Sequence, residues 1–178
     1  VQTGLGRTGR LLACDHEGVK PDGLILGKAL GGGLLPVSAF LARRDVMDVF
    51  TPGDHGSTFG GNPLAAAVGY AALSLLRDGE LIAAAQRLGQ RLRDGLHALQ
   101  HPAIRSVRGK GLLIGLELDP KIISARSFCE RLMENGVLSK ETHHTVVRFA
   151  PPLIINAAEI DAALRIIEHV FATLPTPH

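Results

Sequence analysis

Residues 23–42 read GLILGKALGGGLLPVSAFLA, and this stretch decides the fold. Lys28 is its single ionisable side chain among twenty mostly apolar residues. Such a length could span a membrane, but the glycines and Pro36 break a helix, and lipid tolerates a central lysine poorly. We therefore expect a strand at 24–26, a glycine-rich loop and a strand at 37–41, all buried in an α/β core.

Local signals predict the elements that follow this stretch. Asn62 is a good N-cap and Pro63 suits the first helical position, which predicts a helix to about Arg77. Leucines and alanines at spacings of three and four predict a second helix over 81–99. The remaining expected elements are strands at 104–107 and 112–118, a helix from Ser124 to Asn135, a strand at 146–150 and a last helix that begins with a capping box at Asn156.

Composition and charge narrow the class of protein. With 46% hydrophobic and 20% charged residues, the chain is ordinary for a globular protein. A net charge of +2 without a basic run argues against nucleic acid as a partner. Cys14 and Cys129 lie far apart and fit no metal-ligand spacing, so we expect free thiols, no metal and a reducing cytoplasmic location. Val1 stands inside an apolar stretch without a starting methionine, which favours a truncated or processed chain.

Two glycine patterns suggest nucleotide binding, and neither has the context it needs. Residues 4–9 read GLGRTG, which matches the dinucleotide fingerprint, but polar residues, Gly18 and Pro21 follow too soon for the long helix that the fingerprint requires. Gly27 and Lys28 resemble the end of a Walker loop but lack the Ser or Thr after the lysine. We interpret residues 4–9 as a glycine-rich turn.

Lys28 is the first candidate for chemistry. It stands where an apolar strand is expected to meet a flexible glycine loop, with no acidic residue in the stretch. Burial there would penalise the charged ammonium and favour the neutral amine, which can attack an aldehyde. The glycines would let a bulky planar cofactor approach the backbone.

Two further features could bind anions. The loop at 55–63, HGSTFGGNP, offers the hydroxyls of Ser57 and Thr58 beside a predicted helix N-terminus, an arrangement suited to phosphate. An ordinary capped turn explains the same residues equally well. Arg148 stands alone in an apolar run before two prolines, where a guanidinium needs a carboxylate from the protein or from a substrate. The residues alone leave both sources open.

Taken together, these motifs resemble those of the class III pyridoxal-phosphate-dependent aminotransferases. The resemblance rests on five segments in family order and spacing, and it spans essentially the whole chain. It is greatest for the members that act on ornithine, through the loop at 55–63 and the run KETH at 140–143 that leads to Arg148. The five segments are VQTG at 1–4, GKAL at 27–30, the loop at 55–63, RGKG at 108–111 and RFAPP at 148–152.

The resemblance implies a role for each candidate residue. Lys28 would bond pyridoxal 5'-phosphate covalently and later move a proton, and Gln2 would hydrogen-bond the phenolic oxygen of the cofactor ring. Ser57 and Thr58 would reach the phosphate of the cofactor held by the neighbouring subunit, which implies a homodimer. Arg148 would receive the carboxylate of the oxo-acid. The aspartate that pairs with the pyridine nitrogen in the family would fall two positions before Val1.

The resemblance also implies the fold and the reaction. The fold would be α/β, fold type I, with residues 1–83 in the large domain and its mostly parallel sheet, and residues 84–178 in a small α+β carboxy-terminal domain. The reaction would move the δ-amino group of ornithine to 2-oxoglutarate. Members acting on acetylornithine or 4-aminobutyrate stay open as alternatives, as does a truncated, non-catalytic copy of the enzyme.

Overall fold

The computed structural model describes residues 1–174, apart from the side chain of Asp78. The chain forms two compact units. Unit 1 consists of Val1–Gly6 and Arg10–Leu81, and unit 2 of Arg7–Gly9 and the residues from Ile82 onward. The change of unit after Leu81 lies two residues before the domain boundary expected from the sequence. Residues 7–9 pack in unit 2, which no sequence pattern predicted.

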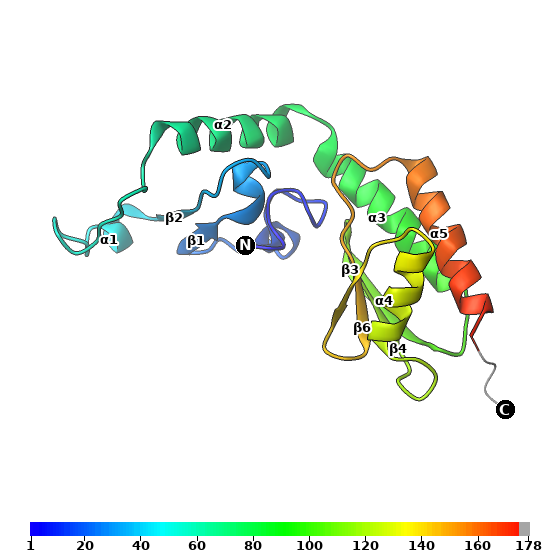
Figure 1. Ribbon diagram of the computed structural model, residues 1–178. Coiled ribbons are helices and arrows are strands. Elements are labelled where there is room, and N and C mark those ends of the chain that lie inside the picture. The colour runs from blue at the N-terminus through cyan, green and yellow to red at the C-terminus, as the bar shows by residue number, and fades with distance from the viewer. Residues whose placement is uncertain (175–178) are drawn as a thin grey trace. The chain divides into compact units, whose positions relative to one another are not determined.

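Unit 1 is built around one short antiparallel strand pair (Figure 1). Leu24 lies opposite Leu41 in this pair. The glycine-rich loop between the two strands begins with a single 3-10 turn, as the many glycines favour. The elements of unit 1 are η1 (Ala13–His16), β1 (Gly23–Leu26), η2 (Lys28–Gly31), β2 (Ala39–Ala42), α1 (Arg44–Met47) and α2 (Pro63–Asp78).

The prediction that residues 23–42 are buried is wrong for this chain. Ile25 is 61% exposed and Phe40 48% exposed, and Lys28 is exposed as well. The strands themselves form, but a two-stranded sheet has too few neighbours to bury both of its faces. Within the part of the chain that the structure describes, no helix has the length and apolar character needed to cross a membrane.

The start of α2 is as predicted. The side chain of Asn62 accepts a hydrogen bond of 2.8 Å from the Ala65 N–H, and Pro63 occupies the first turn. Asn62 satisfies one of the free amide groups that every helix N-terminus presents, and Pro63 has no N–H that would need a partner. This end of α2 also fixes the position of the loop that carries Ser57 and Thr58.

Unit 2 is a four-stranded antiparallel sheet in the order β3-β4-β6-β5 with helices packed on one face (Figure 1). The alternating burial of β4 shows which face is the inner one, since Ile114, Leu116 and Leu118 are buried. From Leu81 onward the elements are α3 (Leu81–Ala98), β3 (Ile104–Lys110), β4 (Leu113–Leu118), α4 (Ala125–Glu134), β5 (Lys140–Thr142), β6 (Val146–Phe149) and α5 (Ala157–Ala172).

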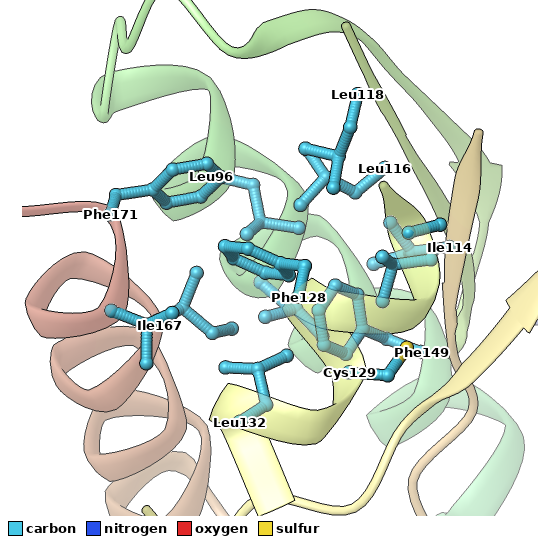
Figure 2. Packing of buried hydrophobic residues seen from close by; sticks show 14 of the residues in the cluster. Leu96, Ile114, Leu116, Leu118, Phe128, Cys129, Leu132, Phe149, Ile167 and Phe171 are labelled. Carbon is cyan, nitrogen blue, oxygen red and sulfur yellow. The ribbon is translucent and has the colours of Figure 1, made fainter. Parts of the chain in front are cut away.

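The core of unit 2 lies between this sheet and the helices α3, α4 and α5. Figure 2 shows Phe128 of α4 near its centre, surrounded by side chains from all three helices and from β4 and β6. The ring centroids of Phe128 and Phe171 are 4.5 Å apart with a 40° tilt, a favourable aromatic geometry. Every strand pairing between residues 1 and 174 is antiparallel. The mostly parallel sheet therefore stays a proposal about the complete protein.

Replacing Asn156 with alanine should lower the free energy of unfolding of unit 2 by about 1 kcal/mol. The Asn156 side chain accepts a hydrogen bond of 3.0 Å from the Glu159 N–H, and the Glu159 carboxylate accepts one of 2.9 Å from the Asn156 N–H. Urea unfolding of the chain measures the loss. The control Asn156→Asp keeps the side-chain acceptor and should stay within about 0.5 kcal/mol of the wild type. An equal loss in both variants would contradict the capping role.

Candidate functional site

Lys28 occupies an unusual backbone position at the end of β1. Gly27 is fully extended, with φ 177° and ψ −161°, and Lys28 then enters the left-handed region at φ 51°. For a residue with a side chain this conformation costs on the order of 1 kcal/mol or more, and such strain collects at functional sites. Gly32, also left-handed at φ 58°, ends the turn by donating its N–H to the Ala29 carbonyl. The lysine side chain is thus placed by a defined turn.

The stretch that carries Gln2 lies beside the Lys28 turn. A Cβ on Gly27 would come within 3.4 Å of Val1 Cγ1, so Val1 packs directly against the residue before Lys28. A cavity of about 220 Å³ lies between the first residues of the chain and β1. Gln2 itself is exposed, so its amide is accessible to a ligand. The structure therefore brings together the segments of two predicted site residues.

The loop before α2 presents Ser57 and Thr58 to solvent. The Ser57 hydroxyl oxygen accepts a hydrogen bond of 2.9 Å from the Gly60 N–H, and its own hydrogen remains available to donate. Asn62 Nδ2 donates to the Phe59 carbonyl at 2.8 Å and closes the loop. Between residues 1 and 174, no hydrogen bond in the structure joins this loop to the Lys28 turn. The two hydroxyls are exposed donors of the kind that an anion requires.

Arg148 lies in unit 2, on β6. Its neighbours across the sheet are Gly115 on β4 and Lys140 on β5. Val147 and Phe149, on either side of it in sequence, belong to the core, so Arg148 faces away from the core. Gly115 has no side chain to cover it. Among the described residues, the half-buried Arg148 guanidinium makes no hydrogen bond and no ion pair.

Glu117, opposite Val146 in the register and on the same face of the sheet as Arg148, already has partners. Glu117 accepts hydrogen bonds of 2.7 Å from Arg108 and 2.9 Å from Ser106. These two donors, Arg108 above all, hold the pKa of Glu117 below its ordinary value. Glu117 is therefore bonded to partners other than Arg148, whose guanidinium has the geometry to receive a carboxylate from a ligand.

Cys14 lines the cavity beside β1, whereas Cys129 lies in the core of unit 2. Both are free, and burial raises the pKa of the Cys129 thiol, which makes it a poor nucleophile. Across residues 1–174, no cluster of three or more histidine, cysteine or acidic side chains could hold a metal ion. One polar side chain with long-range contacts, Arg7, was not predicted as functional, because its partners lie 105 and 144 residues away in the sequence.

The comparison with protein families decides the family. The profile described as aminotransferase class-III matches residues 1–171. The chain belongs to the class-III aminotransferases. This confirms the resemblance inferred from the motifs. It also confirms that the protein is α/β, because its solved relatives share this fold.

Individual class-III aminotransferases give a more detailed comparison. Ornithine aminotransferase 2 of Staphylococcus aureus is 56% identical over 171 residues, covering 96% of this chain and 42% of the relative. An ornithine aminotransferase structure from Toxoplasma gondii, described with partial occupancy of PLP at its active site, gives a TM-score of 0.92 at 50% identity, covering 96% of this chain and 41% of that one. The acetylornithine aminotransferase of Elizabethkingia anophelis gives 0.91 at 49% identity, with coverages of 97% and 46%.

This chain spans less than half the length of the class-III aminotransferases that it matches. The roles of Lys28, Gln2, Ser57, Thr58 and Arg148 stay predictions, because the comparisons concern whole chains and not single residues. The structure places four of these residues in unit 1 and Arg148 in unit 2.

Proposed function

We propose that the complete protein containing this chain is a pyridoxal-phosphate-dependent aminotransferase that transfers the δ-amino group of ornithine to 2-oxoglutarate. The products are glutamate 5-semialdehyde and glutamate. The observation that carries the proposal is Lys28, held in a strained left-handed turn at a strand end, in a chain 56% identical to an ornithine aminotransferase. The free cysteines fit a cytoplasmic location, which belongs to the same proposal.

The side chains of unit 1 fit pyridoxal phosphate. The cofactor needs an amine for its aldehyde and hydrogen-bond donors for its phosphate and ring oxygen, and Lys28, Ser57, Thr58 and Gln2 supply these groups. When bound, the cofactor supplies the electron sink that stabilises a carbanion at the reacting carbon. The left-handed, exposed Gly32 ends the turn that carries Lys28 without a side chain of its own.

Lys28 would carry the proton in this reaction. Its Nζ, when neutral, can take a proton from the carbon bearing the substrate nitrogen and return it to the carbon on the other side of that nitrogen, a 1,3-proton shift. This requires a flexible side chain on a fixed backbone, which the four-carbon stem and the η2 turn provide. Gln2 would hold the ring oxygen from the adjacent stretch by donating its amide N–H.

Ser57 and Thr58 support a homodimer within the same proposal. Their loop forms no hydrogen bond with the Lys28 turn between residues 1 and 174, and in the proposed enzyme these hydroxyls reach the phosphate of the cofactor held by the neighbouring subunit. The exposed apolar residues around the loop and α2, among them Phe59 (82% exposed) and Tyr70 (70% exposed), suit burial in such an interface. We assign unit 1 to the large domain and unit 2 to the small domain of each subunit.

Arg148 would bind the oxo-acid carboxylate. Replacing Arg148 with methionine in the protein made from its complete gene should raise the KM for 2-oxoglutarate about 10- to 100-fold, because a charged hydrogen bond to the substrate is lost. Steady-state kinetics at varied oxo-acid concentration measure the change. Arg131→Met, at an exposed position of α4, is the matched control and should leave KM unchanged. An unchanged KM in Arg148→Met would remove Arg148 from the substrate site.

A second candidate substrate is acetylornithine, which the 49% identical acetylornithine aminotransferase favours. The chain does not distinguish the two donors, because none of its five candidate site residues is assigned to the far end of the donor. 4-Aminobutyrate and a non-catalytic copy of the enzyme are the remaining alternatives.

The deciding experiment compares amino donors. The protein made from its complete gene is supplied with pyridoxal phosphate and 2-oxoglutarate, and glutamate formation is followed with ornithine, acetylornithine or 4-aminobutyrate. We expect ornithine to give the highest kcat/KM. A higher kcat/KM with acetylornithine would change the assigned amino donor but not the proposed reaction type. Absence of transfer from all three donors in a folded protein would favour the non-catalytic copy.

A further inference from the structure

The segment Arg7–Gly9 is inserted into unit 2, although the residues on both sides of it belong to unit 1. Thr8 is buried at 6% exposure. A Cβ on Gly9 would lie 2.8 Å from Gln86 Cβ, and a Cβ on Gly111 would overlap the backbone of Thr8. These glycines allow two backbones to pack in direct contact, so the segment has a fixed place in unit 2.

Arg7 satisfies both backbone polar groups of Leu112, a fully buried residue just before β4. The Leu112 N–H donates to the Arg7 carbonyl at 3.0 Å. The Arg7 guanidinium Nη1 donates to the Leu112 carbonyl at 3.1 Å and also to the Pro151 carbonyl, just after β6. Buried backbone groups that lose their partners are costly, so Leu112 depends on Arg7.

The register of the sheet explains why an arginine is needed there. Ile114 of β4 pairs with Phe149 of β6, and two steps further in this register Leu112 stands opposite Pro151. Proline has no N–H, so it cannot donate the hydrogen bond that would continue the ladder. The Arg7 guanidinium supplies the missing donor and bonds the carbonyl of each strand at this position.

The hydrogen bonds that Arg7 makes to Leu112 and Pro151 form a bridge between the ends of the two strands. This bridge lies next to Arg148 in the register. Arg148 precedes Pro151 by three residues, and its partner Gly115 follows Leu112 by three. We propose that Arg7 is a positioning residue: by closing the β4–β6 ladder beyond Arg148, it fixes the strand from which the Arg148 guanidinium reaches the oxo-acid carboxylate. The kinetic part of this inference rests on the proposed function, whereas the structural part does not.

Hydrogen exchange tests the structural part without any ligand. In Arg7→Met, which keeps the apolar stem but removes the donors, we expect the amides of Leu112 and Arg148 to exchange about tenfold faster, the size of one lost charged hydrogen bond. Arg7→Lys retains a charged donor and should recover part of this protection. The matched control is Arg93→Met, which removes an arginine that donates to the Gly109 carbonyl on β3 at 2.6 Å. It should leave both amides unchanged.

Kinetics of the protein made from its complete gene test the positioning role. Arg7→Met should raise the KM for 2-oxoglutarate about tenfold, leave kcat within about twofold, and leave the ornithine half-reaction unchanged. Arg7→Lys should restore KM in part. The proposal would be overturned if Arg7→Met and Arg93→Met changed the kinetics alike. In that case kcat would fall and the KM values for both substrates would rise by the same factor in the two variants, which would show a general loss of stability.

The two proposals fail in different ways. If the wild type transfers no amino group, the proposed function is overturned together with the kinetic part of this inference, while hydrogen exchange still decides whether Arg7 closes the ladder. If the wild type is active and Arg7→Met changes neither amide exchange nor the KM for 2-oxoglutarate, Arg7 is not a positioning residue and the proposed function stands.

Discussion

Lys28→Ala is expected to lower kcat/KM for amino transfer by about 10²- to 10⁴-fold or more, because the variant loses both the amine that bonds the cofactor and the group that moves the proton. The protein made from its complete gene provides the assay. Reduction with borohydride in the presence of pyridoxal phosphate should also attach the cofactor at residue 28 of the wild type, as peptide mass spectrometry detects.

Lys20→Ala is the matched control for this prediction. Lys20 is an exposed lysine of the same unit, eight residues before Lys28, and its loss should change neither activity nor labelling. Labelling spread over several lysines would show that the chain has no selective cofactor site. Retained activity in Lys28→Ala would remove this residue from the mechanism.

Gly89→Ala should destabilise unit 2 by about 3 kcal/mol or more, although alanine is normally the better helix residue. Gly89 is buried in α3, and a Cβ there would overlap the carbonyl of Gly111. Backbone lies on both sides of this contact, so no side chain can move aside to relieve it. Calorimetric unfolding of the chain measures the loss.

The same substitution in α2 is the control. A Cβ on Gly69 would lie 3.7 Å from the Leu30 carbonyl oxygen, an ordinary van der Waals distance. Gly69→Ala should therefore stabilise α2 by about 0.5–1 kcal/mol through helix propensity alone. Similar changes for both variants would contradict the close packing of α3 against the Gly111 turn.

Elements with local signals were predicted well. Asn62, Ser124 and Asn156 each cap the helix that the sequence predicted for them, since a cap depends on residues within one turn. β5 (Lys140–Thr142) was missed because three polar residues show no alternation, and only the register with β6 makes them a strand. β2 begins at Ala39, two residues later than predicted, an error typical of element boundaries.

The site depends more on distant contacts, and these were harder to predict. Lys28 stands out in the sequence through its apolar surroundings, but the burial inferred from them is absent, because burial is set by what packs on a strand and not by the strand itself. Its left-handed backbone could not be predicted either, since glycines usually take such positions. Arg7 stands in a glycine-rich turn, and nothing within ten residues indicates that it bonds Leu112 and Pro151.

The bridge made by Arg7 has a consequence for the order in which the protein is made and folds. Its bond to Pro151 joins residues 144 positions apart, so Arg7–Gly9 cannot take their place until Pro151 has been synthesised. At about 5–20 residues per second, this segment waits on the order of ten seconds after its own synthesis. The docking of Arg7–Gly9 is thereby coupled to the completion of unit 2.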